Sequence, residues 1–338
     1  MPVRDLLIVG AGPSGLAAAI AAKEHGLDCQ ILEKGVLANS IYHFPPQMVF
    51  FTTPELLEIG GVPLVSPYEK PTRVEALRYY RRVTDAFSLQ IAFDERVVSI
   101  AREPDDDPAE EHLFVVETVS PLGVRRARHA RNVLMAIGYY DHPNYIGVPG
   151  EDLPHVHHYY GEPYPYYRRR VVVVGGGNSA AESSLELHRA GAHVTLVHRH
   201  PELKSTIKYW VRPDIENRIT EGSIAARLGA TIAEIRPRSV VVASAGGSGT
   251  ETEEIPADAV FLLTGYHPNW DLMTAAGVAL NDRMAPVFHP ETFETNVPGL
   301  FVAGGALAGR DTGTIFIENG RFHGKRVVDA IAARLIGA

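Results

Sequence analysis

The chain has 338 residues, of which 45% are hydrophobic, and this length suits about two domains with packed cores. Its 40 acidic residues outnumber its 32 basic ones by eight, so no overall positive field exists to attract nucleic acid or an anionic membrane. A single cysteine, Cys29, excludes an intrachain disulfide, a CxxC redox pair and a cysteine-based zinc site. The apolar runs are too short to span a membrane and no leader-like segment stands out, so we expect a cytoplasmic protein.

The first pattern along the chain is a strand, a glycine-rich turn, a helix and a second strand within about 30 residues. Residues 6–9 form a short apolar run typical of a strand buried on both faces. Gly10 permits a tight bend, Gly12 lets the backbone approach a pyrophosphate, and Gly15 lets the helix lie close to the strand. Glu33 ends the second strand, where a carboxylate binds ribose hydroxyls and repels a 2′-phosphate. This site therefore favours FAD or NAD over NADP.

The same pattern recurs in the middle of the chain. An apolar run at 171–174 precedes three glycines at 175–177, followed by another helix and strand. The strand runs into His198, Arg199 and His200 and carries no acid. Arg199 suits a 2′-phosphate, with His198 or His200 in support, although solvated residues after a strand are the alternative. We predict NADPH at this second site, and the economical chemistry of the pair is hydride transfer from NADPH to FAD.

Both halves continue with runs of alternating apolar and polar residues, a pattern typical of strands around a turn. These runs cover residues 97–119 and 123–135 around an acidic loop at 103–108, and residues 232–242 and 260–264 around a flexible turn at 245–250. We expect each half to append a small sheet. A late buried strand at 300–304 and a final helix at 319–336 close the chain.

Four strings, at residues 136–138, 148–152, 264–268 and 300–304, resemble the domain crossovers, linker and last FAD-binding strand of one group. That group is the low-molecular-weight thioredoxin reductase-like flavoproteins, in which the NADPH domain is inserted into the FAD domain. The resemblance implies an α/β fold of two Rossmann-like three-layer nucleotide-binding domains. It places the FAD-binding domain at 1–140 and 268–338, and the NADPH-binding domain at 141–267.

Other strings, at residues 39–45, 50–51, 57–60, 138–141, 143–145 and 315–321, most closely resemble the YpdA-type bacillithiol-disulfide reductases. The chain departs from the wider group at residues 156–160, which hold no CxxC and so exclude thioredoxin reduction by a dithiol relay. Ser14 stands where the subfamily commonly has its cysteine, so the thiol mechanism does not carry over. Gly305 stands where the group usually has an Asp that holds the ribityl chain, and that contact must be replaced or lost.

The candidate site residues follow from the two glycine patterns and from the resemblance, and the flavin itself supplies the reaction. The predicted FAD contacts are Gly10, Gly12, Pro13, Ser14, Gly15, Glu33, Lys34, Ser40, His43, Phe44, Val97, Gly138, Gly304, Thr314 and Ile315. The predicted NADPH contacts are Gly175, Gly177, Asn178, Ser179, Ala180, His198, Arg199 and Gly265. Thr314 and Ile315 precede the last helix, whose N-terminal amides would stabilise charge on the reduced flavin. Core packing is the alternative for the aromatic rings at 42–51.

Together these patterns imply an FAD-dependent NADPH oxidoreductase. The resemblance implies that its acceptor is a low-molecular-weight disulfide, such as bacillithiol disulfide or its mixed disulfide on a small redox protein. A ferredoxin or flavodoxin reductase is one alternative, and an FAD-binding redox sensor without turnover is another. Relatives in the group are commonly homodimers, and the resemblance implies the same here.

Three further segments have weaker functional interpretations. We expect no metal site at His155, His157 and His158, which lack helical spacing and a carboxylate partner. Residues 208–210 offer an acceptor surface or a helix anchor. Residues 168–170 offer a local basic patch for an acidic partner or cap the strand that follows. We expect Cys29 to be a buried structural residue.

Overall fold

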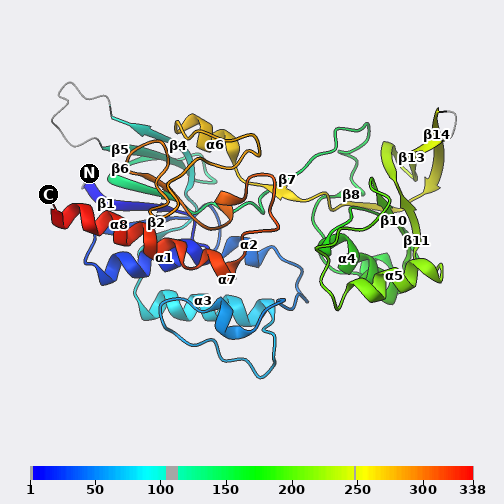
Figure 1. Cartoon of the computed structure of the whole chain (residues 1–338), viewed down its shortest axis with the longest axis horizontal. Helices are drawn as coiled ribbons and strands as arrows, with labels where there is room; N and C mark the ends of the chain where they lie inside the picture. The colour runs from blue at the N-terminus through cyan, green and yellow to red at the C-terminus, as the bar shows by residue number, and fades with distance from the viewer. Residues whose placement is uncertain (1–2, 104–112, 247–248, 338) are drawn as a thin grey trace. The chain divides into compact units, whose positions relative to one another are not determined.

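The computed structural model describes residues 3–103, 113–246 and 249–337. The chain divides into two compact units (Figure 1): unit 1 comprises Met1–His142 and Tyr266–Ala338, and unit 2 comprises Pro143–Gly265. Unit 2 is therefore an insertion in the sequence of unit 1, and each boundary lies two residues from the predicted one. The chain passes between the units through β7 (His142–Pro143) and β16 (Tyr266–His267), which pair as a two-stranded sheet.

Unit 1 is built on a seven-stranded sheet in the order β3-β2-β1-β6-β5-β4, with β17 added beside β6. The strands are β1 (Val3–Val9), β2 (Cys29–Leu32), β3 (Ile91–Ala92), β4 (Arg96–Arg102), β5 (Phe114–Val119), β6 (Arg125–Met135) and β17 (Leu300–Val302). β1, β2, β3, β6 and β17 are parallel, and β5 is antiparallel to β4 and β6. The expected separate small sheet is wrong for this unit, because β6 pairs with β5 in its first half and with β1 from His129 to Met135, and so joins both to the main sheet. The acidic loop expected at 103–108 lies almost wholly outside the described residues.

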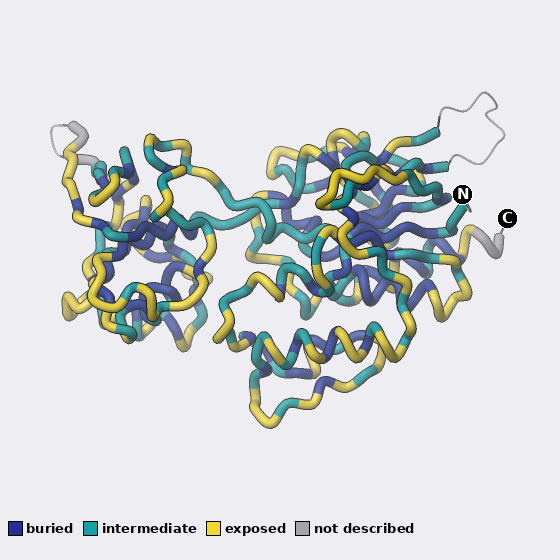
Figure 2. Tube along the Cα trace, turned by 180° about the vertical axis from the view of Figure 1, so that it is seen from behind, coloured by how far each residue is buried: buried dark blue, intermediate teal, exposed yellow. Residues whose placement is uncertain are grey.

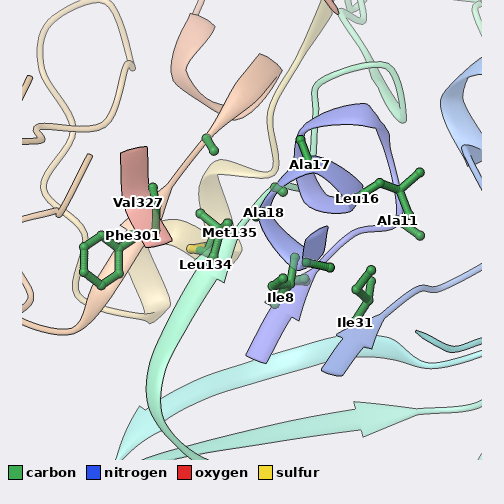
Figure 3. Close-up of a cluster of buried hydrophobic side chains, with 14 of the residues drawn as sticks. Ile8, Ala11, Leu16, Ala17, Ala18, Ile31, Leu134, Met135, Phe301 and Val327 are labelled. Carbon is green, nitrogen blue, oxygen red and sulfur yellow. The ribbon is translucent and has the colours of Figure 1, made fainter. Parts of the chain in front are cut away.

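Helices cover the sheet of unit 1. They are α1 (Pro13–Glu24), α2 (Asn39–Tyr42), α3 (Arg73–Ala86), α6 (Trp270–Ala275), α7 (Ile317–Gly320) and α8 (His323–Gly337), with short 3-10 turns η1 (Pro54–Leu57) and η3 (Gly304–Ala308). The alanine-rich α1 is buried between the sheet and α8, and a Cβ atom at Gly324 would lie 2.6 Å from the Ala18 nitrogen. The core includes Leu16 of α1, Phe301 of β17 and Val327 of α8 (Figure 3). The single final helix expected at 319–336 is instead α7 and α8.

Unit 2 contains a parallel sheet in the order β11-β10-β9-β15-β8 and an antiparallel sheet β12-β13-β14. Its elements are β8 (Val156–His157), η2 (Tyr164–Tyr166), β9 (Arg170–Val174), α4 (Asn178–Arg189), β10 (His193–His198), α5 (Arg212–Thr220), β11 (Ala225–Leu228), β12 (Ala230–Arg236), β13 (Ser239–Gly246), β14 (Gly249–Pro256) and β15 (Ala259–Leu262). The sequence did not predict β14. Four of its consecutive residues are polar and exposed, so they lack the alternation of apolar and polar residues that is typical of a strand.

The side chains of β9 show why unit 2 has three layers. Alternate residues of a strand point to opposite faces. Val171 and Val173 belong to the core under α4 and α5, whereas Val172 and Val174 belong to the core under β12–β14. In Figure 2 the buried segments of unit 2 lie in its interior and the exposed ones lie on its outside. The prediction of an α/β fold with two Rossmann-like units is confirmed by this arrangement.

Candidate dinucleotide sites

The functional edge of unit 1 lies where its parallel strands end. β2, β1, β6 and β17 are consecutive neighbours here and run in the same direction, so their carboxyl ends meet at one edge. Ligands of open α/β sheets bind outside this edge. Glu33 follows β2, Gly10 follows β1, Gly138 follows β6 and Gly304 follows β17. The structure thus brings the predicted FAD residues of four distant segments to one edge.

The first glycine loop has the shape of a phosphate cradle. Gly10 has φ +108°, and a Cβ atom there would lie 2.5 Å from the Ala136 carbonyl oxygen. A Cβ atom at Gly15 would lie 2.0 Å from the Gly10 oxygen, whereas one at Gly12 would meet nothing within 4 Å. Gly12 is the N-cap of α1 and contributes no side-chain cap, and Pro13 begins the helix with its fixed φ. The N-terminus of α1 therefore has no side-chain cap and has open space at Gly12, as a bound pyrophosphate requires.

Glu33 is 4% exposed, and the backbone of the first glycine loop hydrogen-bonds to its side chain. Its carboxylate accepts hydrogen bonds from the Ala11 nitrogen at 2.7 Å and the Gly35 nitrogen at 2.9 Å. Burial raises the pKa of Glu33, although both amide bonds oppose the shift. Its backbone oxygen accepts from the Glu95 nitrogen at 2.8 Å, which places the start of β4, with buried Val97, beside the ribose position.

Lys34 has a partner that the sequence did not reveal. Its Nζ lies 2.8 Å from the carboxylate of Asp141, just before the crossover strand β7. The cation therefore ties the glycine-loop region to the end of unit 1's first segment. Its predicted contact with FAD stays a prediction.

Ser14 lies at a junction of three segments. Its Oγ donates to the Gly320 carbonyl at 3.1 Å. A Cβ atom at Gly304, which has φ +63°, would lie 2.3 Å from the Ser14 Oγ, and one at Gly320 would lie 3.3 Å from it and 3.7 Å from Ile315. The hydroxyl thus joins α1 to η3 and α7 through backbone atoms. Ile315 reaches this junction, whereas Thr314 is exposed and donates its hydroxyl to the Asp311 carbonyl.

His323 completes this junction and was missed by sequence reasoning. Its Nδ1 accepts a hydrogen bond from the Gly304 nitrogen at 3.2 Å. Burial lowers the pKa of His323 to about 4, so the ring is neutral and keeps its acceptor nitrogen at physiological pH. No local pattern marks a histidine that supports a glycine nineteen residues earlier.

The predicted helix dipole near the flavin has to be corrected. α7 contains only four residues, and α8 begins after it at His323. A one-turn helix carries a much smaller macrodipole than the long final helix that was expected. The Asn319 side chain accepts from the Phe316 nitrogen and donates to the Thr314 oxygen, so it satisfies the local backbone groups instead.

Ser40, His43 and Phe44 lie against the segment after β6. The Ser40 hydroxyl is 3.9 Å from the Cβ position of Gly138. Phe44 packs edge-on against Tyr140 with ring centroids 4.9 Å apart, and the Tyr140 hydroxyl donates to the His43 carbonyl at 3.4 Å. These predicted residues therefore share one side of the carboxyl edge.

The second glycine loop, in unit 2, repeats the cradle with one change. Gly175 has φ +150°, and a Cβ atom there would lie 2.5 Å from the Leu263 oxygen. Gly177 caps α4 without a side-chain bond. Ala180, fully buried, stands where Gly15 stands in unit 1. Asn178 accepts from the Lys208 nitrogen at 2.9 Å and donates to the Thr206 carbonyl at 3.2 Å, so it holds residues 206–208 beside the loop, whereas Ser179 is exposed.

The cations after β10 are arranged differently from the prediction. His198 is 5% exposed, and its ring lies 2.2 Å from the Cβ position of Gly176, so it packs beneath the loop. Burial, followed by the neighbouring cations, lowers the pKa of His198. Arg199 and His200 are exposed. The position of His198 is thus unlike the exposed one that a phosphate contact requires.

Lys204 is a further cation at this loop, and sequence reasoning missed it. Its nitrogen donates to the Gly176 carbonyl at 2.9 Å, and its Cδ lies 3.9 Å from the Cβ position of Gly177. The segment after β10 therefore folds back over the glycines and carries its ammonium group with it. A lysine six residues after the end of a strand is not a recognisable signal on its own.

The remaining candidates lie apart from the two loops. Gly265, with φ +96°, accepts from the Asn144 nitrogen at 2.9 Å at the crossover, where it stays a predicted contact. Arg170 forms an ion pair with Asp258. The expectation that the three histidines lack a carboxylate partner is wrong for His158, which lies 3.7 Å from Glu151, and no group of three potential metal ligands occurs among the described residues. Cys29 is half-buried, and burial followed by Asp28 raises its pKa to about 11, so it is a poor nucleophile.

Two glycine loops at the carboxyl edges of two α/β units are typical of oxidoreductases that use two dinucleotides. The model of the pyridine nucleotide-disulphide oxidoreductase family matches residues 7–304, and the chain belongs to this family. It is accordingly a flavoprotein oxidoreductase that uses a pyridine nucleotide. No helix in the described part of the chain is long and apolar enough to cross a membrane.

The more specific resemblance is also confirmed. The chain is 41% identical to the protein named bacilliredoxin reductase Bdr of Bacillus subtilis strain 168. The alignment spans 329 residues and covers 97% of each chain. It resembles the structure of the bacillithiol disulfide reductase Bdr (YpdA) from Bacillus cereus with a TM-score of 0.93 and 39% identity, over 98% of this chain and 100% of that one. The corresponding Staphylococcus aureus structure gives a TM-score of 0.90 and 35% identity over 99% of both chains.

Proposed function

We propose that unit 1 binds FAD and unit 2 binds NADPH. The observation that carries this proposal is the contrast between the groups beside the two cradles. Glu33 is a carboxylate at the ribose end of one, whereas Arg199, His200 and Lys204 are the side chains near the other. A carboxylate repels a 2′-phosphate and cations attract it. Gly12 and Gly177 fit the pyrophosphates, because neither α1 nor α4 has a side-chain cap that would occupy its first amides.

The proposed reaction converts NADPH, a proton and a low-molecular-weight disulfide into NADP⁺ and two thiols. Bound FAD would supply the two-electron carrier between the nicotinamide and the sulfur atoms. The acceptor class, bacillithiol disulfide or its mixed disulfide on a small redox protein, is supported by 41% identity to a bacilliredoxin reductase. The protein's own residues bind and orient the two dinucleotides. A cytoplasmic homodimer belongs to the same proposal.

The proposed disulfide reaction does not use a thiol at position 14, because this residue is a serine. Its hydroxyl donates to the Gly320 carbonyl, so it serves packing at the junction of α1, η3 and α7. Cys29, the single cysteine of the chain, lies within β2 and has a raised pKa. No covalent disulfide between enzyme and substrate is therefore part of the mechanism.

The test is an anaerobic spectrum of the FAD-loaded protein. One equivalent of NADPH should bleach the flavin, and bacillithiol disulfide should restore the oxidised spectrum. Ser14→Ala should restore it at a rate within about threefold of the wild type, because only one neutral hydrogen bond is lost. Flavin that bleaches but is reoxidised by ferredoxin or flavodoxin and not by the disulfide would replace this acceptor with the alternative one. Flavin that NADPH does not bleach would favour the sensor.

A further inference from the structure

Tyr139 and Gly305 meet at the carboxyl edge of unit 1. Tyr139 lies four residues after the end of β6, and Gly305 lies three residues after the end of β17. The two strands are parallel neighbours, with Val302 opposite Met135, so the segments that leave them run side by side. Contact between two residues so distant in sequence follows from this pairing.

The ring of Tyr139 occupies the space of a side chain at position 305. A Cβ atom built on Gly305 would lie 2.8 Å from Cδ1 and 3.1 Å from Cε1 of Tyr139. The backbone itself does not demand glycine, because Gly305 is absent from the glycines with positive φ. Gly304, its neighbour, has φ +63° and does require one. Glycine at 305 is therefore a steric consequence of the tyrosine.

The hydroxyl of Tyr139 has no hydrogen-bond partner among the residues that the structure describes. Tyr140, the next residue, differs, because its hydroxyl donates to the His43 carbonyl. The Tyr139 side chain is partly buried, and burial followed by the charge of Glu318 raises its pKa. The phenol thus keeps its proton at neutral pH and remains a donor without an acceptor in the protein.

The path of the proposed FAD along the carboxyl edge of unit 1 brings a hydrogen-bond acceptor to the Tyr139 hydroxyl. In the proposed complex, the adenosine ribose of FAD lies at Glu33, after β2, and the pyrophosphate lies on the Gly10 loop, after β1. Strands are spaced by about 4.8 Å, so the next two positions along the edge are the ends of β6 and β17. These are the positions of Tyr139 and Gly305. The flavin half of the molecule would therefore reach this pair.

We propose that Tyr139 binds the flavin half of FAD by donating its hydroxyl to an oxygen of that half, and that Gly305 leaves room for its ring. This proposal rests on the proposed function, since it requires FAD in unit 1. Tyr139 is then part of the binding site, and Gly305 is a positioning residue that acts through it.

The hydroxyl is tested with Tyr139→Phe, which keeps the ring against Gly305. We expect FAD to bind about five- to tenfold more weakly, as for one lost neutral hydrogen bond, and the visible absorption bands of the bound flavin to shift. Tyr68→Phe, which removes the hydroxyl of an exposed tyrosine between η1 and α3, is the matched control, and it should leave both the FAD dissociation constant and the bands unchanged. Titration of apoprotein with FAD, followed by flavin fluorescence, measures the constant.

The steric relation is tested with a double-mutant cycle. Gly305→Ala should displace the ring and weaken FAD binding more than Tyr139→Phe does. The same substitution in a Tyr139→Ala background should have no further effect, because the conflicting ring is gone. Circular dichroism and thermal unfolding of each apoprotein separate misfolding from weak binding.

The outcomes distinguish the two proposals. If wild-type protein binds no FAD, the proposed function fails first. If it binds FAD and Tyr139→Phe equals the wild type in affinity and spectrum, the assignment of Tyr139 is overturned. If Gly305→Ala weakens binding equally with and without the Tyr139 ring, the steric role of the ring is overturned.

Discussion

The two units hold the same glycine loop in different surroundings. In unit 1, α1 is enclosed between the sheet and α8, and a Cβ atom at Gly15 would lie 2.0 Å from the Gly10 oxygen. In unit 2, Ala180 takes the third position of the loop and is accommodated at full burial. The bend and the open phosphate position are common to both loops, whereas the closeness of helix to strand is not. The comparison teaches that the third glycine serves packing, whereas the second leaves open the space where we propose that the pyrophosphate binds.

The two units also differ in the charge beside the loop. Glu33 is buried and receives two backbone hydrogen bonds, so it is part of the folded loop even without a ligand. Arg199 of unit 2 is exposed and Lys204 reaches over the loop from a later segment. The acid that we propose to bind ribose is thus built into the fold, while the cations that we propose to bind the 2′-phosphate lie at the surface.

The largest expected effect comes from Gly15→Ala. The added methyl group would overlap the Gly10 oxygen, which is backbone and cannot move away, so we expect a loss of more than about 3 kcal/mol in the free energy of unfolding and loss of bound FAD. Gly12→Ala is the matched control, because its Cβ meets nothing in the protein. That variant should keep the unfolding temperature of the apoprotein and lose FAD affinity alone. Equal unfolding temperatures for the two apoproteins would refute the distinction between packing and ligand glycines.

A smaller effect is expected from the cations of unit 2. Arg199→Ala and Lys204→Ala should each raise the KM for NADPH about tenfold and leave that for NADH nearly unchanged, because only NADPH carries the 2′-phosphate. Arg212→Ala, whose side chain pairs with Glu216 on α5, serves as the control. Steady-state rates with both nucleotides give the ratio. An unchanged ratio in both variants would remove these residues from the site.

The smallest effect concerns Glu182, a partly buried acid in the first half of α4. The equivalent part of α1 contains no acidic residue. Burial, followed by the charge of Glu186, raises the pKa of Glu182 to about 7. The folded state therefore keeps a proton that the unfolded chain has already lost, and the free energy of unfolding falls as the pH rises from about 4.5 to about 7. Glu182→Gln should accordingly stabilise the apoprotein by about 1 kcal/mol at pH 8 and hardly at all at pH 4. Urea unfolding at both pH values measures this, with exposed Glu216→Gln as control, and equal gains at both would contradict it.

Local patterns revealed the loops, and pairing between distant segments remained hidden. The turn at Gly10 and the acid at Glu33 are close in sequence, and strand, turn and helix each have their own signal. The place of β6 beside β1 depends on long-range register, so its strand pattern predicted an appended sheet. Lys204 reaches the second loop because its segment folds back over Gly176, and no periodicity records that path. The contact between Tyr139 and Gly305 likewise exists because β6 and β17 pair.

The crossover ribbon has a consequence for how such a protein can be rearranged. Asn144 and Gly265, near the two ends of unit 2, are joined by a backbone hydrogen bond of 2.9 Å, and β7 and β16 pair beside them. Chain segments that pair in this way can be closed by a two-residue hairpin. Joining His142 to Tyr266 through such a turn should excise unit 2 and leave unit 1 as one continuous chain. The same junction should accept a foreign module in place of unit 2.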